Sequence, residues 1–350
     1  MSLPTRRRLL RAMTTAPMVA VLTSIRASAQ VRLRLLLNSG YSSVNAWFCL
    51  ADDRGYLRDA GLTLEFTAGR GAYTAAGRTA DEGFDIGYGD VNALVEQVAA
   101  SNPRAPLAVY MMFNRSPSVV AVPATGSIRA PRDLTGRHLR GHATDVALQT
   151  FPALTMRAGI DAKGVRISTT EDGMGTQATA MLRGDIDGIF GYESTITAAL
   201  ITAGIPVERV RFLFFRDVVP ELYGSALMAS RQLVREQPKL VAGLVRAINH
   251  GVADAVAEPD AAIAAVRARV PTMVERAERA RLERTLQGEM SHPESATLGI
   301  GAIDATRFAA GIQLLCTSKA LAKVPSVTDV FSTAFPVPAR ERITGLASRL

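Results

Sequence analysis

The segment Phe84-Asp85-Ile86-Gly87-Tyr88-Gly89-Asp90 is the clearest indication of how this chain folds. Residues 84–88 predict a short buried strand, which Gly89-Asp90 ends. The residues that follow, 91–100, carry apolar side chains at helical spacing. Asp90 stands where an N-cap residue accepts the first free backbone N–H groups of such a helix. The segment therefore predicts a strand that leads directly into a helix, which is the repeating unit of α/β proteins.

The same alternation continues on both sides of this segment. We expect further strands at 31–38, 62–66, 107–113, 118–122, 137–141, 165–169, 188–192, 210–215 and 222–229. We expect helices between them at 43–54, 73–81, 145–158, 176–183 and 194–203. After about residue 231 only helical spacing remains, at 240–257, 260–269, 274–287 and 306–319. Two parallel α/β lobes and a helical tail follow from this pattern, and no linker separates the lobes, so the crossings between them would act as hinges.

The positive charge of the chain is concentrated at its N-terminus. Residues 1–29 hold five arginines and no acid, so the rest keeps 35 basic and 32 acidic residues, a net charge of +3 against +8 for the whole chain. Arginines at 6–8 precede a soft apolar run over 12–25, and Ala27-Ser28-Ala29 has the small residues that a signal peptidase reads. The paired arginines resemble a twin-arginine export signal, with an ordinary secretory signal as the alternative. We expect cleavage after Ala29, a periplasmic location and no nucleic-acid partner.

Composition narrows the class of the remaining chain. With 48% hydrophobic and 21% charged residues the chain is globular, and about 320 residues predict two domains. No uninterrupted apolar run reaches about 18 residues, so we expect no membrane-spanning helix after residue 29. Cys49 and Cys316 could be bridged in an oxidising compartment or be two buried thiols. The four histidines lack metal-ligand spacing, and no phosphate loop or nucleophile elbow occurs, so we expect no metal, no cofactor and no enzymatic activity.

Five short motifs resemble, in order and spacing, the periplasmic solute-binding proteins of ABC importers. The nearest branch includes the alkanesulfonate, nitrate and thiamine-pyrimidine (thiamine-biosynthesis-like) binders. The motifs are 53–62 (DRGYLRDAGL), 84–90 (FDIGYGD), 127–137 (SIRAPRDLTGR), 158–165 (AGIDAKGV) and 182–188 (LRGDIDG). Eukaryotic relatives that make the thiamine pyrimidine carry a cysteine-rich motif that this chain lacks, which weighs against an enzyme.

The resemblance implies an α/β type II periplasmic-binding-protein fold, with two lobes and a ligand cleft between them. Lobe one would comprise residues 30–117 and 229–350, and lobe two residues 118–228. The implied protein is a monomer that binds a small organic solute of sulfonate, carboxylate or pyrimidine type by lobe closure, without chemistry, and delivers it to an ABC permease. A pyrimidine-processing enzyme on the same fold and a ligand-presenting sensor subunit are the alternatives.

Residues that follow strands, at helix N-termini, are expected to face this cleft, because free N–H groups and partial positive charge gather there. The candidates in lobe one are Asn38, Tyr41, Asn45, Arg70, Tyr88, Asp90, Asn114 and Arg115. Tyr41 could stack on a ligand or be an ordinary turn aromatic. Asp90 could contact a ligand or only cap its helix. Arg115 could clamp an anion or be a solvated hinge charge. Trp47 lies inside a helix, and core packing is its expected role.

Lobe two and its return crossing contribute Thr144, Asp145, Tyr192, Glu193 and Tyr223 as candidates. Glu193 could pair with a cationic nitrogen of a ligand, or form a cap or hinge salt bridge. Together with Asp90 it indicates a nitrogen-bearing ligand. Arg70, Arg115 and the helix N-termini indicate an anion instead. The two indications are compatible only if the ligand is zwitterionic or carries both a nitrogen group and an anionic group.

Overall fold

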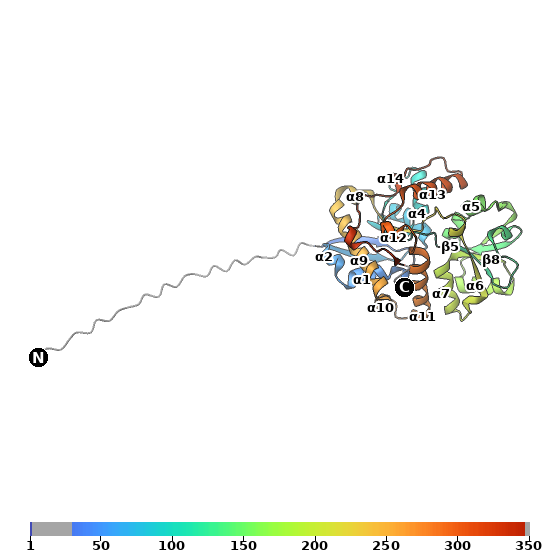
Figure 1. The fold of residues 1–350 in the computed structure, drawn as a ribbon, viewed down its shortest axis with the longest axis horizontal. Helices are drawn as coiled ribbons and strands as arrows, with labels where there is room; N and C mark the ends of the chain where they lie inside the picture. Colours follow the sequence, from blue (N-terminus) through green and yellow to red (C-terminus); the bar gives the residue numbers. More distant parts are fainter. Residues whose placement is uncertain (2–29, 347–350) are drawn as a thin grey trace.

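The computed structural model describes Met1 and residues 30–346, which contain two five-stranded sheets flanked by helices (Figure 1). The first sheet has the order β2-β1-β3-β10-β4 and the second the order β7-β6-β8-β5-β9. The first is built from β1 (Val31–Leu36), β2 (Leu62–Thr67), β3 (Ile86–Asp90), β4 (Leu107–Met111) and β10 (Ser225–Ala229). The second is built from β5 (Ser118–Pro123), β6 (His138–Gly141), β7 (Arg166–Thr169), β8 (Gly188–Tyr192) and β9 (Val210–Phe214). All ten expected strands are therefore confirmed, with small differences at their ends.

Neither sheet is purely parallel, and the expectation of parallel units is wrong for two strands. β1 pairs in parallel with β2 and β3, and β6 pairs in parallel with β7 and β8. β10 runs antiparallel to β3 and β4, and β5 runs antiparallel to β8 and β9. These two strands are the ones that follow a crossing between the sheets. Helices between strands predict a parallel direction only where the chain stays in one sheet.

The sheets define the two lobes, and the second lobe boundary differs from the expected one. The chain enters the second sheet at β5, whose first residue is Ser118. It returns before Ser225, because β10 pairs with β3 and β4 of the first sheet. The expected return at residue 229 is therefore wrong. All five β10 side chains are buried, and such an apolar run fits the interior of either sheet.

The helices of each lobe cover the faces of its own sheet. Lobe one has α1 (Ala46–Asp53), α2 (Tyr56–Asp59), α3 (Ala75–Asp81), α4 (Val91–Ala99), α8 (Arg231–Glu236), α9 (Pro238–Ala257), α10 (Pro259–Arg269), α12 (Ser295–Leu298), α13 (Ala305–Ser318) and α14 (Val327–Val330). Lobe two has α5 (Val146–Ala158), α6 (Met174–Arg183) and α7 (Glu193–Thr202). Short 3-10 turns lie at Ser43–Asn45, Ala72–Thr74, Pro131–Leu134, Ala162–Gly164, Val207–Arg209, Phe215–Asp217 and Ala339–Glu341.

The core of lobe one is centred on Trp47, which is fully buried as expected. Its ring packs edge-on against Phe48, Tyr88 and Phe113. α9 crosses α1 behind it, and a Cβ on Gly251 would collide with the Trp47 carbonyl oxygen. By length and composition alone α9 could cross a membrane, but its apolar face lies in this core, with Val241, Leu244 and other residues buried.

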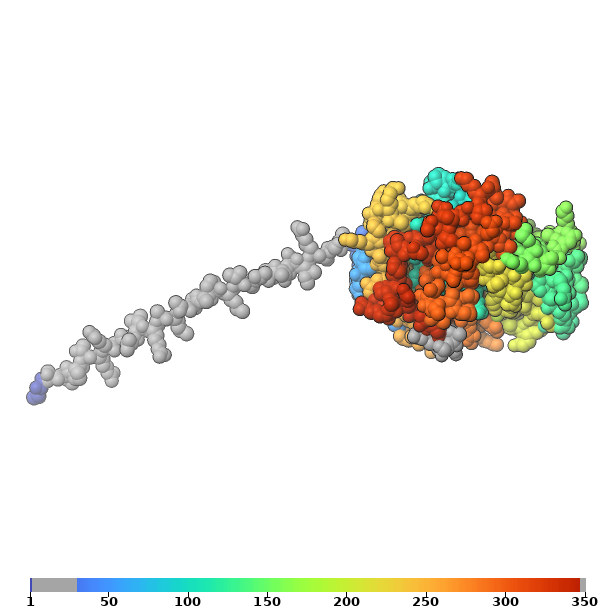
Figure 2. All heavy atoms as spheres, turned by 45° about the horizontal axis from the view of Figure 1, so that its top comes forward, coloured from blue at the N-terminus to red at the C-terminus, as the bar shows by residue number. Residues whose placement is uncertain are grey.

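The helical tail joins the two lobes. α11 (Glu275–Arg284) continues into a π-helical turn, Thr285–Met290, and α11 packs against α7 of lobe two. In Figure 2 the orange and red tail spreads over one face of lobe one and meets the yellow-green atoms of lobe two. The expected helix at 274–287 is confirmed, and the π-helical turn at its end was not predicted. π-Helical turns are rare and often occur at functional sites.

Candidate functional site

A cleft of about 550 Å³ lies between the two lobes. Lobe one lines it with the turns that follow β1 and β2, and lobe two with the segments that follow β6, β7 and β8. The tail adds Arg281 and Glu289. Arg70, Thr144 and Glu171 are exposed at its rim. The buried side of the lining, which includes Asn38 and Glu289, is its floor.

Five of the thirteen residues expected to face a ligand lie on this lining: Asn38, Arg70, Thr144, Asp145 and Tyr192. They share the position that the sequence argument used, because each lies at or just after the C-terminal end of a strand. The other eight do not line the cleft: Tyr41, Asn45, Tyr88, Asp90, Asn114, Arg115, Glu193 and Tyr223. Most of these eight follow strands too, but their side chains are used in packing, capping or ion pairs within the protein.

Asn45 and Tyr41 support the turn after β1 rather than the lining. Asn45 Nδ2 donates to Asn38 Oδ1 at 3.2 Å, so Asn45 orients the amide that does face the cleft. Tyr41 packs edge-on against Phe66, with ring centroids 6.3 Å apart. This contact agrees with the alternative expectation for Tyr41, that it is an ordinary aromatic residue of a turn.

Asp145 shapes the lobe-two side of the lining. It is the N-cap residue of α5 without a side-chain capping bond. Its Oδ2 instead accepts a hydrogen bond from the His142 backbone N–H at 3.1 Å. The neighbouring carboxylate of Asp145 raises the pKa of the His142 imidazole, because it stabilises the charged ring. The start of α5 is thereby left facing the cleft with its backbone N–H groups.

Buried acids and phenols lie beneath the floor of the cleft, next to the lining. Asp90 is fully buried, and its Oδ1 accepts from the Asn92 backbone N–H at 2.9 Å, so the capping alternative for Asp90 is confirmed. Its Oδ2 lies 3.5 Å from the Tyr192 hydroxyl, which reaches it from lobe two. Burial raises the pKa of Asp90 to about 7. Tyr88 is fully buried beside it in the aromatic core.

Glu193 forms a salt bridge, which was the alternative to a ligand contact for this residue. Its carboxylate is 2.9 Å from Arg284 Nη1 of α11 and 3.7 Å from Arg216 Nη2. The side chain is only 5% exposed. Both oxygens thus face arginines of the protein, as the salt-bridge interpretation expected, and a contact between Glu193 and a ligand nitrogen stays a prediction. The pair fixes the tail to the start of α7.

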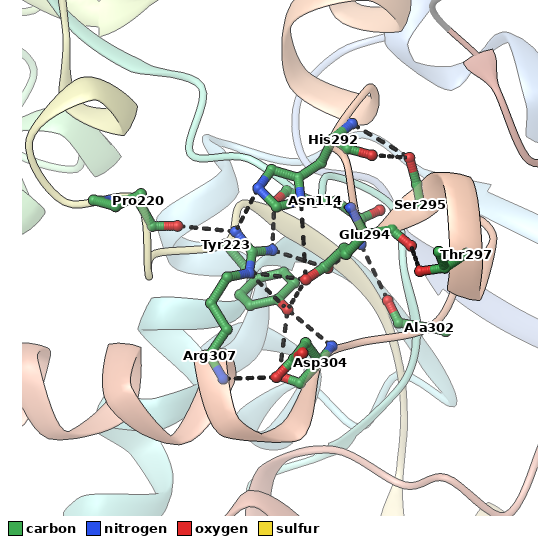
Figure 3. Close-up of polar contacts among 10 residues, drawn as sticks. All are labelled: Asn114, Pro220, Tyr223, His292, Glu294, Ser295, Thr297, Ala302, Asp304 and Arg307. Atoms are coloured by element: carbon green, nitrogen blue, oxygen red, sulfur yellow. Dashed lines mark hydrogen bonds and ion pairs between the residues drawn. The ribbon is translucent and has the colours of Figure 1, made fainter.

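Asn114 and Tyr223 belong to a buried polar network at the two crossings (Figure 3). The Arg307 guanidinium lies over the Tyr223 ring, 3.7 Å from its centroid, and pairs with Glu294 at 2.9 Å. Tyr223 donates its hydroxyl hydrogen to Glu294 Oε2 at 2.9 Å, and Asn114 Nδ2 donates to Glu294 Oε1 at 2.7 Å. We call Asn114, Tyr223, Glu294 and Arg307 the crossing network. Its members hold the crossings to the tail, which explains why neither Asn114 nor Tyr223 lines the cleft.

Arg115 lies beside this network and not on the lining. Its backbone N–H donates to the Glu289 carbonyl oxygen at 3.0 Å. Burial and the nearby Arg216 lower the pKa of its guanidinium. Arg115 thus lies at the first crossing, where the hinge interpretation placed it, but it is partly buried rather than solvated, and contact with an anion stays a prediction.

The lining also contains residues that the sequence argument missed, above all Arg281 and Glu289 of the tail. Arg281 Nη1 donates to Thr195 Oγ1 of α7 at 3.1 Å, while Arg281 Nε donates to Glu278 at 3.2 Å. The candidates were expected only at the ends of strands, and the tail from α11 onward contains no strand in the described residues. One signal was present: Glu289 follows Leu282 by seven residues and Leu286 by three, which places an acid on the buried stripe of a helix.

Metal ligands do not gather in the described part of the chain. Within residues 30–346, no group of three or more His, Cys, Asp or Glu side chains is placed to hold a metal ion.

Comparison with known proteins places the chain in a family. Among solved structures, the alkanesulfonate-binding protein SsuA from Xanthomonas axonopodis pv. citri, bound to MOPS, has a TM-score of 0.63 at 15% identity, covering 87% of this chain and 99% of that one. The periplasmic aliphatic sulphonate binding protein SsuA from Escherichia coli has a TM-score of 0.65 at 15% identity, covering 88% and 94%. DszB in complex with biphenyl-2-sulfinic acid has a TM-score of 0.55 at 15% identity, covering 87% and 98%.

These likenesses establish the periplasmic-binding-protein fold that the motifs implied. Comparison with curated proteins finds no match. The family model described as NMT1/THI5 like matches residues 43–262, which is more than half of the chain. The chain therefore belongs to the NMT1/THI5-like family.

Proposed function

We propose that this protein is the solute-binding component of an ABC importer and that it works in the periplasm. The observation that carries this proposal is the cleft of about 550 Å³ between two α/β lobes, lined from both lobes and from the tail. A site of this kind can enclose a small organic molecule when the lobes close. The two SsuA proteins with this fold are named as binders of alkanesulfonate and aliphatic sulphonate.

In this proposal Asn38, Arg70, Thr144, Asp145 and Tyr192 contact the solute. Closure would bring the lobe-one and lobe-two members of this set onto opposite sides of the ligand. The closed form would then dock on a permease in the inner membrane, as a monomer and without chemical change to the solute. Residues 2–29, which hold the proposed export signal, lie outside the described residues, and cleavage after Ala29 belongs to the same proposal.

Thermal stability tests the proposal. Protein without residues 1–29 is heated with single compounds from a panel of sulfonates, carboxylates, amino acids and amino-substituted heterocycles. A bound solute raises Tm by several degrees when its concentration is far above Kd. The stabilising compound is then incubated with the protein and recovered. Recovery of the unchanged compound supports binding without chemistry, conversion to a product supports the enzyme alternative, and a panel without any stabilising compound contradicts the proposal.

A further inference from the structure

Glu289 on the cleft floor is a buried carboxylate without an ion-pair partner among the described residues. Its side chain is fully buried, and neither oxygen accepts a hydrogen bond of normal geometry from a described residue. The hydroxyl groups of Ser194 and Thr285 lie close enough to stabilise its charged form, but no described cation pairs with it directly. Buried polar groups in proteins are nearly always hydrogen-bonded, because an unpaired buried carboxylate costs several kcal/mol. The carboxylate of Glu289 therefore keeps hydrogen-bond acceptor capacity that the described residues do not use fully.

The charges around Glu289 indicate what would complete it. Glu193 faces it from α7, and Arg216 faces it from the turn 215–217, although Arg216 pairs with Glu193. The phenols of Tyr88 and Tyr192 face it from β3 and from the end of β8. Asp90 adds a second buried acid behind Tyr192. An anionic group placed here would meet two acids at close range, whereas a hydrogen-bond donor would find unused acceptor oxygens.

We propose that Glu289 accepts hydrogen bonds from a nitrogen group of the solute, such as an ammonium, an amidinium or an amino-substituted ring. This inference rests on the proposed solute-binding function and narrows its ligand class. Charge-assisted N–H···O⁻ bonds are the strongest that such a site can form. The exposed Arg70 at the rim could hold an acceptor or anionic group at the other end of the same molecule. A simple alkanesulfonate has no N–H group that could donate a hydrogen bond to Glu289 on the cleft floor.

Protonation gives the site a second signature. Burial raises the pKa of Glu289 to about 7; the hydroxyl groups of Ser194 and Thr285 oppose this rise, as does the more distant Arg216, while Glu193 adds to it. Asp90 titrates in the same range. In the empty cleft Glu289 is thus largely protonated below pH 7, and a cationic solute must displace that proton. Affinity for such a solute increases as the pH rises through 7, provided that the solute itself stays protonated.

The experiment compares ligand classes on two variants. Ammonium, amidine and amino-ring compounds are each matched with a sulfonate of similar size, for example benzamidine with benzenesulfonate, and calorimetry gives Kd for every compound that raises Tm. We expect the tightest compound to carry an N–H donor group. Glu289→Gln weakens it by about 10- to 100-fold, as loss of a charged hydrogen bond does. Glu283→Gln, an exposed acid on α11 outside the lining, leaves Kd unchanged.

The outcomes separate this inference from the function beneath it. If the tightest compound is a sulfonate without N–H donors, or if Glu289→Gln binds the tightest compound as well as the unaltered protein does, the inference about Glu289 is wrong while solute binding stands. If no compound of any class raises Tm, both the proposed function and the inference fail. Retention of affinity in Glu283→Gln together with its loss in Glu289→Gln supports both.

Discussion

At the scale of single residues, two buried acids have pKa values raised to about 7: Glu289 on the cleft floor and Asp90 beneath it. Burial is the main cause in each, because a carboxylate loses its hydration there. Asp90 offsets part of this cost by capping α4, whereas Glu289 has only the nearby hydroxyl groups of Ser194 and Thr285 to offset it. Between pH 4.5 and 7 the folded protein therefore binds more protons than the unfolded chain does. The free energy of unfolding falls as the pH rises through this window.

We predict that Glu289→Gln removes part of this pH dependence. When the pH is raised from 5 to 8, the free energy of unfolding of the unaltered protein should fall by on the order of 2 kcal/mol more than that of the variant. Urea unfolding at the two pH values measures the difference. Glu283→Gln should show no such change, because that acid is exposed. Parallel pH curves for Glu289→Gln and the unaltered protein would mean that the Glu289 carboxyl is not desolvated.

At the scale of elements, the tail fastens segments that are distant in the sequence. The crossing network joins the first crossing at Asn114, the second at Tyr223 and the tail at Glu294 and Arg307 (Figure 3). Arg307 also donates to the carbonyl oxygens of Pro220 and Asn114, at 2.9 and 2.7 Å. The arginine side chain is 15% exposed and the glutamate 9%, so the pair is poorly screened by water.

Arg307→Met is expected to lower the free energy of unfolding by about 3 kcal/mol, because it leaves the Glu294 carboxylate buried without its ion-pair partner. Chemical denaturation measures the loss. The matched change Arg235→Met removes an exposed arginine that pairs only with the adjacent Glu236, and should cost less than about 1 kcal/mol. Equal losses in the two variants would show that the crossing network contributes no more than a surface pair.

At the scale of the whole molecule, the first sheet separates the two cysteines. Cys49 belongs to the core cluster with Trp47 and Leu227, and Cys316 to the cluster with Ala226 and Met228. Adjacent residues of a strand point to opposite faces of its sheet, so the two thiols lie on opposite sides of β10. Both are free and buried in the structure, which decides the open question of a bridge in favour of two thiols.

Neither thiol should therefore react before the protein unfolds. In native protein, both should resist a thiol reagent for as long as global unfolding is slow, since burial also raises the pKa of each thiol. Addition of urea should release two thiols in the same transition that fluorescence of Trp47 reports. A reductant should leave Tm unchanged. A lower Tm in reductant, or fewer than two thiols in urea, would indicate a disulfide.

The sequence by itself determined the ten strands, most of the helices and the family. These features follow from local apolar periodicity and from short motifs, which a one-dimensional pattern contains. The same reasoning placed Asn38, Arg70, Thr144, Asp145 and Tyr192 at strand ends, and these line the cleft. Strand direction after the crossings, and the return at β10, depend instead on which sheet receives a strand.

Only the tertiary structure decided which polar side chains remain free. Glu193 and Glu289 are both acids on helical segments close to the same cleft. The first is neutralised by Arg284 and Arg216, and the second has no ion-pair partner among the described residues. Ion pairs of this kind form between residues about 90 positions apart, such as Glu193 and Arg284, and local pattern contains no information about them. Glu289 could therefore be identified as the candidate ligand-binding acid only from the packing, because burial and pairing are properties of the folded chain.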